Sequence, residues 1–134
     1  MTNQEAFDIN WNYFVVGKGK RSTAGGGICA YRGEGGSKCG IGLLIPDDKY
    51  DPVFEGSCVP DGHPPSEGKR YAFLRVLNEL GFGDDQLYFL SELQDCHDNA
   101  PEQYFHKAIE SSLRELADRF DLTVPSVNST KGNQ

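Results

Sequence analysis

Residues 28–45 read ICAYRGEGGSKCGIGLLI, and this stretch decides the fold class that the sequence predicts. Two β-prone runs, ICAYR and KCGIGLLI, flank the glycine-rich turn GEGGS, which is typical of a β-hairpin. With Tyr31 opposite Cys39, one face of the hairpin would carry Cys29, Tyr31, Cys39, Ile41 and Leu43. A two-stranded hairpin is marginal alone, so we expect it to pack on helices or to gain strands from elsewhere.

The sequence on both sides of this stretch predicts helices. Thr2 and Glu5 form a capping box ahead of an apolar stripe, which predicts a helix over about 3–16. Further stripes predict helices over about 67–80, 85–98 and 101–121. These stripes consist of Phe73, Leu74, Leu77 and Leu80, then Leu87, Leu90 and Leu93, and finally Phe105, Ile109, Leu113, Leu116 and Phe120.

Residues 46–66, PDDKYDPVFEGSCVPDGHPPS, predict a long irregular loop because five prolines exclude a regular helix or a central strand. The expected order is an N-terminal helix, a β-hairpin, this loop and three C-terminal helices. Helices and strands that do not alternate indicate the α+β class. We expect a single domain over 1–125 and a disordered polar tail over 126–134.

The charge of the chain is unevenly distributed. The 134 residues carry a net charge of −7, with +2 in residues 1–45 and −9 in residues 46–134. An acidic surface repels nucleic acids and favours basic protein surfaces, although the basic residues near 18–21 could contact a phosphate locally. The chain has no apolar run of membrane-span length and no signal-peptide pattern, so we expect a cytoplasmic protein without membrane contact.

The four cysteines, Cys29, Cys39, Cys58 and Cys96, have no spacing typical of a zinc site, and free thiols are the expected state in a reducing compartment. No metal site or cofactor is predicted. The loop GKGKRST at 17–23 departs from the P-loop pattern, because Arg21 stands where Ser or Thr should follow the lysine.

The stretch LQDCHD at 93–98 is the strongest local candidate for chemistry. Adjacent residues point about 100° apart on a helix, so Cys96 and His97 cannot form a dyad with each other. A nucleophilic Cys96 would need an imidazole from His63 or His106. The favoured interpretation is a helix end with a buried thiol, and the alternative is a small hydrolase. That hydrolase would use Cys39 or Cys96 with His97 and Asp98, or a metal.

The loop after residue 45 is the expected partner-binding surface. It combines acidic and aromatic side chains, and aromatic anchors with a polar rim dominate the energetics of protein interfaces. The spacing of the acids fails the EF-hand pattern. The predicted contact residues are Asp47, Asp48, Tyr50, Asp51 and Phe54.

Three pieces of the sequence resemble a group of small, largely uncharacterised proteins of tailed phages and prophages: CAYR at 29–32, KCGIGLLIPDDKY at 38–50 and LQDCHD at 93–98. Their pattern is roughly Cys-x-Tyr-Arg, then Gly-x-Lys-Cys-x-x-Gly-x-Leu-Ile-Pro-Asp, and later Leu-Gln-x-x-His-Asp, and the resemblance would span residues 4–125. The group carries no activity that can be transferred. The resemblance implies an accessory phage protein made in the bacterial cytoplasm.

These observations favour a non-enzymatic accessory protein that binds and modulates or inhibits a host protein, such as a defence protein, through an acidic surface. The first alternative is the cysteine/histidine or metal-dependent hydrolase. A third interpretation is a nucleic-acid mimic, although interspersed Lys and Arg residues dilute its acidic surface. The edge of the hairpin could also pair with a second copy of the chain to form a homo-oligomer.

Overall fold

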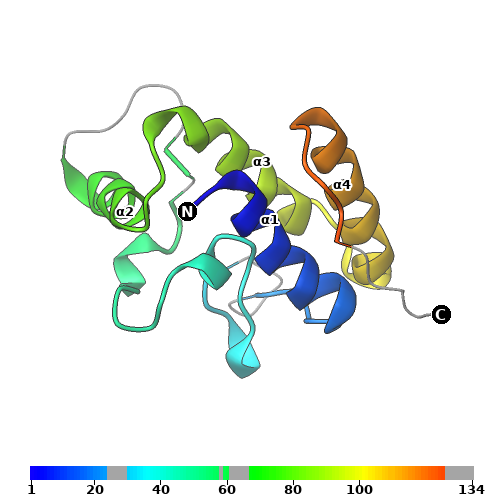
Figure 1. Cartoon of the computed structure of the whole chain (residues 1–134). Coiled ribbons are helices and arrows are strands. Elements are labelled where there is room, and N and C mark those ends of the chain that lie inside the picture. The colour runs from blue at the N-terminus through cyan, green and yellow to red at the C-terminus, as the bar shows by residue number, and fades with distance from the viewer. Residues whose placement is uncertain (24–29, 58, 61–66, 126–134) are drawn as a thin grey trace.

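The computed structural model describes residues 1–23, 30–57, 59–60 and 67–125. Its longer helices are α1 (Asn3–Trp11), α2 (Gly68–Glu79), α3 (Leu87–Asp98) and α4 (Phe105–Arg119). A π-helix, η1 (Asn12–Val16), continues α1. Short 3-10 turns are η2 (Glu34–Gly36), η3 (Gly42–Leu44), η4 (Pro52–Phe54), η5 (Asp84–Gln86) and η6 (Glu102–Tyr104). Figure 1 shows α2 and α4 on opposite sides of the molecule, with α1 and α3 between them.

The α+β prediction is wrong, because the described residues contain no β-strand and the fold is helical. Where a hairpin was expected, a single antiparallel bridge joins Arg32 and Lys38. A Cβ on Gly42 would lie only 2.0 Å from the Tyr31 carbonyl oxygen, so the glycine allows a backbone approach closer than a strand pair permits. The hairpin edge proposed for a homo-oligomer is therefore absent from the part of the chain that the structure describes.

The four helix predictions are confirmed. The capping box is present, with the Thr2 side chain accepting from the Glu5 amide and the Glu5 carboxylate accepting from the Thr2 amide. Gly81 follows α2 with a φ of 92°, the left-handed conformation that glycine adopts most easily after a helix. The loop expected over 46–66 is irregular where it is described, apart from η4.

One hydrophobic cluster joins the helices to the irregular segments. Phe7 and Trp11 of α1 and Phe14 of η1 are fully buried, so this first helical segment lies at the centre of the cluster. Tyr31 and Phe54 pack their rings on Phe73 of α2, with centroids 5.0 and 5.3 Å away. Tyr31, Cys39 and Ile41 of the expected hairpin therefore enter the core without forming strands, and Leu43 is partly buried against it.

The structure does not test the predicted disordered tail or the predicted single domain. The tail over 126–134 lies outside the described residues, as do Cys29, Cys58 and His63. The assignment of 1–125 to a single domain remains a prediction. Among the helices of the described residues, none has both the length and the apolar character needed to cross a membrane.

Candidate functional site

His97 lies near the end of α3, fully buried, and anchors a polar network. Its Nε2 accepts the Ser22 amide at 2.9 Å, so the ring proton is on Nδ1, which donates to Asp98 Oδ1 at 2.8 Å. The same Asp98 oxygen accepts from Gln94 Nε2 at 2.7 Å, and Gln94 Oε1 accepts the Ile41 amide at 3.0 Å. The network thus ties two irregular segments, around Ser22 and Ile41, to one face of α3.

This geometry assigns His97 a structural role. A general base or metal ligand needs a free ring-nitrogen lone pair, and the Nε2 lone pair of His97 already accepts the Ser22 amide. The ring packs between Phe14 and Phe105, with centroids 5.6 and 5.5 Å away, and has no exposed surface. His97 therefore supports the fold with both ring nitrogens.

The two described thiols, Cys39 and Cys96, are poor nucleophiles. Burial raises the pKa of Cys39 to about 12, and burial likewise raises the pKa of Cys96 to about 12. Cys39 Sγ accepts the Gly42 amide at 3.3 Å, whereas the charges that act on Cys96 include Arg119 of α4. The described residues show no hydrogen bond between a thiol and an imidazole.

The candidate catalytic residues Cys96, His97, Asp98 and Cys39 thus have separate structural roles. The two thiols are buried, and His97 and Asp98 are members of the hydrogen-bond network. Asp98 lines a cavity of about 190 Å³. No group of three or more His, Cys, Asp or Glu side chains in the described ranges could hold a metal ion.

Glu55 anchors the loop that follows residue 45, which we call the acidic loop. Its Oε1 accepts the Tyr31 amide at 3.0 Å, and its Oε2 accepts the Arg32 amide at 3.0 Å and the Tyr50 hydroxyl at 2.5 Å. Burial, with the hydrogen bond to Glu55, raises the pKa of Tyr50 to about 12, so the hydroxyl remains a donor. One carboxylate therefore holds the loop against the segment that carries Tyr31 and Arg32.

Arg32 provides the second anchor. Its guanidinium donates to the Ile45 carbonyl at 2.6 Å and to Asp47 at 2.7 Å, and it lies over the Tyr50 ring at 4.6 Å from the centroid. The Asp47 side chain is still 85% exposed. The loop thus holds a defined shape while presenting its carboxylates to solvent.

A hollow of about 360 Å³ lies between this loop and α2, and we call it the acidic loop groove. Its lining residues are Asp48, Lys49, Tyr50, Asp51 and Phe54 of the loop, with Ala72, Arg75, Val76 and Glu79 of α2. Asp48 and Asp51 are exposed and Tyr50 is partly buried. Lys49 pairs with Glu79 at 3.1 Å, which leaves Asp48 and Asp51 against Arg75 as the remaining charges of the lining.

Phe54 does not present the contact surface expected of it. Its side chain is 2% exposed and stacks on Phe73, so it forms part of the core beneath the groove. Surface position therefore supports four of the five predicted contact residues, namely Asp47, Asp48, Tyr50 and Asp51. Their role in binding remains a prediction.

Several structural anchors were missed by sequence reasoning. Asn10, buried on α1, donates to the carbonyls of Ala6 and Gly40 at 3.0 and 3.1 Å. Asn10 lies one turn from Phe7 and Phe14, and Gln94 follows Leu93 directly. A polar residue on an otherwise apolar helix face is a signal for a buried hydrogen bond. The identity of the partner, however, required the fold.

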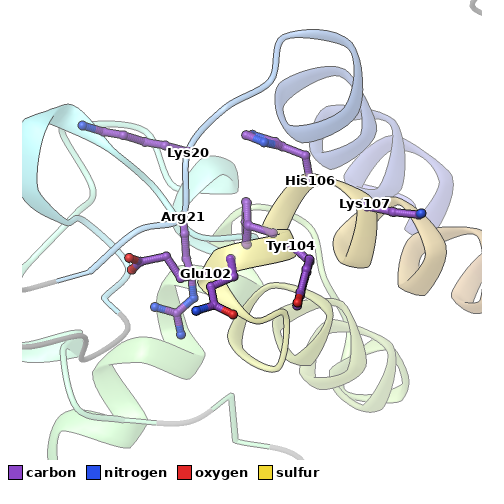
Figure 2. A pocket seen from close by; sticks show the side chains of 8 residues that line it. Lys20, Arg21, Glu102, Tyr104, His106 and Lys107 are labelled. Atoms are coloured by element: carbon purple, nitrogen blue, oxygen red, sulfur yellow. The ribbon is translucent and has the colours of Figure 1, made fainter.

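A second hollow, of about 570 Å³, lies between the segment before Ser22 and the start of α4 (Figure 2), and we call it the basic pocket. Its lining residues are Lys20, Arg21, Glu102, Gln103, Tyr104, Phe105, His106 and Lys107. His106 Nε2 donates to the Gly19 carbonyl at 2.9 Å, and Arg21 Nε donates to the Ala100 carbonyl at 3.3 Å. These bonds fix both walls of the pocket to each other.

Comparison of the chain with models of protein families, with curated proteins and with solved structures finds no match in any of the three.

Proposed function

We propose that this chain is a non-enzymatic binding protein that receives a basic segment of a protein partner in the acidic loop groove. The observation that carries the proposal is the combination of exposed carboxylates with a fixed loop shape. Asp48 and Asp51 are exposed, while Glu55 and Arg32 hold the backbone beneath them. A preformed surface loses less conformational entropy when a partner binds.

The groove also offers apolar contact. Ala72 and Val76 of α2 line it beside the partly buried ring of Tyr50. Val53 and Tyr71 do not line the groove but are neighbours in sequence of its lining residues Phe54 and Ala72, and they are 41% and 38% exposed. An apolar centre with a charged rim is the usual anatomy of a protein interface.

Charge complementarity selects the class of partner. The lining of the groove carries three carboxylates, Asp48, Asp51 and Glu79, against Lys49 and Arg75, and it lies within residues 46–134, whose net charge is −9. Such a field attracts basic surfaces and accelerates their association, more so at low salt. In the setting that the resemblance to phage accessory proteins implies, the partner is a host protein and the chain acts in the bacterial cytoplasm, modulating or inhibiting that protein by occupying its surface.

Paired charge variants test this proposal. Asp48→Asn with Asp51→Asn removes two groove carboxylates, and asparagine at 51 can still accept the Val53 amide. Glu115→Gln with Asp118→Asn removes the same charge from exposed positions on α4. The wild type and both double variants are immobilised and exposed to the same bacterial lysate, and bound proteins are quantified by mass spectrometry.

We expect a partner that the wild type and the α4 variant retain equally and the groove variant loses. With the purified partner, the groove variant should raise Kd on the order of a hundredfold, since each of the two lost charge-assisted contacts costs about 1.5 kcal/mol. No protein above background, or equal recovery by all three baits, would refute the proposal.

A further inference from the structure

The geometry points to a second binding site, the basic pocket, which takes a small phosphate-bearing aromatic ligand of the nucleotide class. This site does not depend on the acidic loop groove, because its residues come from the segment before Ser22 and from the start of α4. Figure 1 places α4 on the side of the molecule opposite α2. The two proposals can therefore fail separately.

Charge is the first argument. The lining contains three basic side chains, Lys20, Arg21 and Lys107, against the single carboxylate of Glu102, and Arg21 is already engaged in bonds within the protein. The pocket is thus locally positive in a chain whose net charge is −7. Lys20 and Lys107 are exposed, so their ammonium groups are available to solvent or to an anion. A local reversal of charge at a concave surface selects anionic ligands.

Size and aromatic surface narrow the class of ligand. A volume of about 570 Å³ lies within the range of small-molecule sites and exceeds what a single phosphate fills. Tyr104 at the pocket is 65% exposed, so its ring is accessible to a ligand. Exposed aromatic rings beside cations are the stacking platforms by which proteins hold nucleobases.

The directions of the lining side chains indicate how tightly the pocket should bind its ligand. In Figure 2, Lys20 and Lys107 extend to opposite sides of the pocket, while Arg21 and Glu102 lie together on one side. The two lysines must therefore turn inward to contact one phosphate group, and ordering their side chains opposes binding. We expect a Kd of roughly 0.1–1 mM.

The test is titration of the full chain with ADP, adenosine and inorganic pyrophosphate, followed by calorimetry and amide chemical shifts. The variants are Lys20→Gln with Lys107→Gln, and Tyr104→Ala. The matched control is Lys69→Gln with Arg70→Gln, which removes two exposed cations from α2. All the substituted side chains are exposed, so the fold should persist, and shifts of residues 102–107 in the wild type locate the site without any variant.

We expect ADP to shift residues 102–107, and adenosine to bind more weakly. The pocket double variant should raise the Kd for ADP about tenfold, and Tyr104→Ala severalfold, while the α2 control leaves it unchanged. Absence of ADP binding, or equal weakening by both charge variants, would overturn the site. Pyrophosphate binding as tightly as ADP, with no effect of Tyr104→Ala, would overturn the nucleotide assignment.

Discussion

Replacing His97 by alanine separates a structural histidine from a catalytic one. A catalytic histidine can be removed with little change in stability, whereas the His97 imidazole fills buried space between Phe14 and Phe105 and accepts the Ser22 amide. Leaving that buried amide unpaired costs about 1–3 kcal/mol. Emptying the space of a ring costs roughly 2 kcal/mol more. Asp98 keeps its bond from Gln94 and adds little.

The sum, about 4 kcal/mol, is a large part of the 5–15 kcal/mol typical of a folded protein. In a chain of this length it lowers Tm by roughly 15 °C. Urea denaturation at 25 °C measures the change through the midpoint, provided that the slope m stays constant. His106→Ala is the matched control, because His106 is half-buried and makes one bond to the Gly19 carbonyl. We expect it to cost about 1 kcal/mol.

A loss below about 1 kcal/mol in His97→Ala would refute this reasoning, since neither a buried unpaired amide nor a cavity is compatible with so small a change. Equal losses in the two histidine variants would refute it as well. Either result would restore His97 as a candidate for chemistry.

Two further predictions concern the irregular segments and the thiols. Gly42→Ala should lower the free energy of unfolding by about 3 kcal/mol in urea denaturation, because its Cβ would lie 2.0 Å from the Tyr31 carbonyl oxygen. The control Gly36→Ala, whose Cβ meets nothing within 4 Å at a φ of 77°, should lower it by only about 1 kcal/mol. Equal losses would contradict the close approach. Cys39 and Cys96, with pKa values of about 12, should resist iodoacetamide at pH 8.5 in the folded state and react at once in urea. Since the unfolded thiols ionise near pH 9, the contribution of each to stability is complete below pH 9 and falls by about 1.4 kcal/mol per pH unit up to pH 12. Peptide mapping of the alkylated sites checks the resistance to iodoacetamide, and urea denaturation at a series of pH values checks the loss of stability. Rapid labelling of Cys39 in the folded protein would contradict both expectations.

The helices were predictable because their signals are local. Phe105, Ile109, Leu113 and Leu116 repeat at helical spacing and are all buried on α4. The capping box at Thr2 lies within four residues of sequence. Such patterns need no knowledge of distant partners, which explains why the four helical ranges could be predicted.

The hairpin prediction was wrong because, beyond the Arg32–Lys38 bridge, several of its backbone amides bond side chains elsewhere in the chain. Gly40 and Gly42 allow close approaches to Asn10 and to Tyr31. The amide of Ile41 bonds Gln94, a residue 53 positions away, in place of a neighbouring strand. β-propensity describes how residues fit a pleated surface, and here the same apolar side chains are buried by turns.

The candidate sites also combine features that the sequence predicts with features that depend on the fold. Carboxylates at Asp48 and Asp51 are exposed, as expected for a loop rich in acid and proline. The burial of Phe54 could not be predicted, because it depends on the position of Phe73 in α2. The sequence shows the basic pocket only as separate cations, since Lys20 and Lys107 come to line one hollow through tertiary packing.

The long sequence separations in the His97 network have a kinetic consequence. The partners Ser22 and His97 are 75 positions apart, and Ile41 and Gln94 are 53 apart. Closing such loops is entropically costly, so we expect these bonds to form after the helices, and because Ser22, Ile41 and His97 are fully buried they should open only when α3 leaves the core. In a hydrogen-exchange experiment the amide protons of Ser22 and Ile41 would then exchange together, through one opening of α3 away from both segments, and at a rate set by that event.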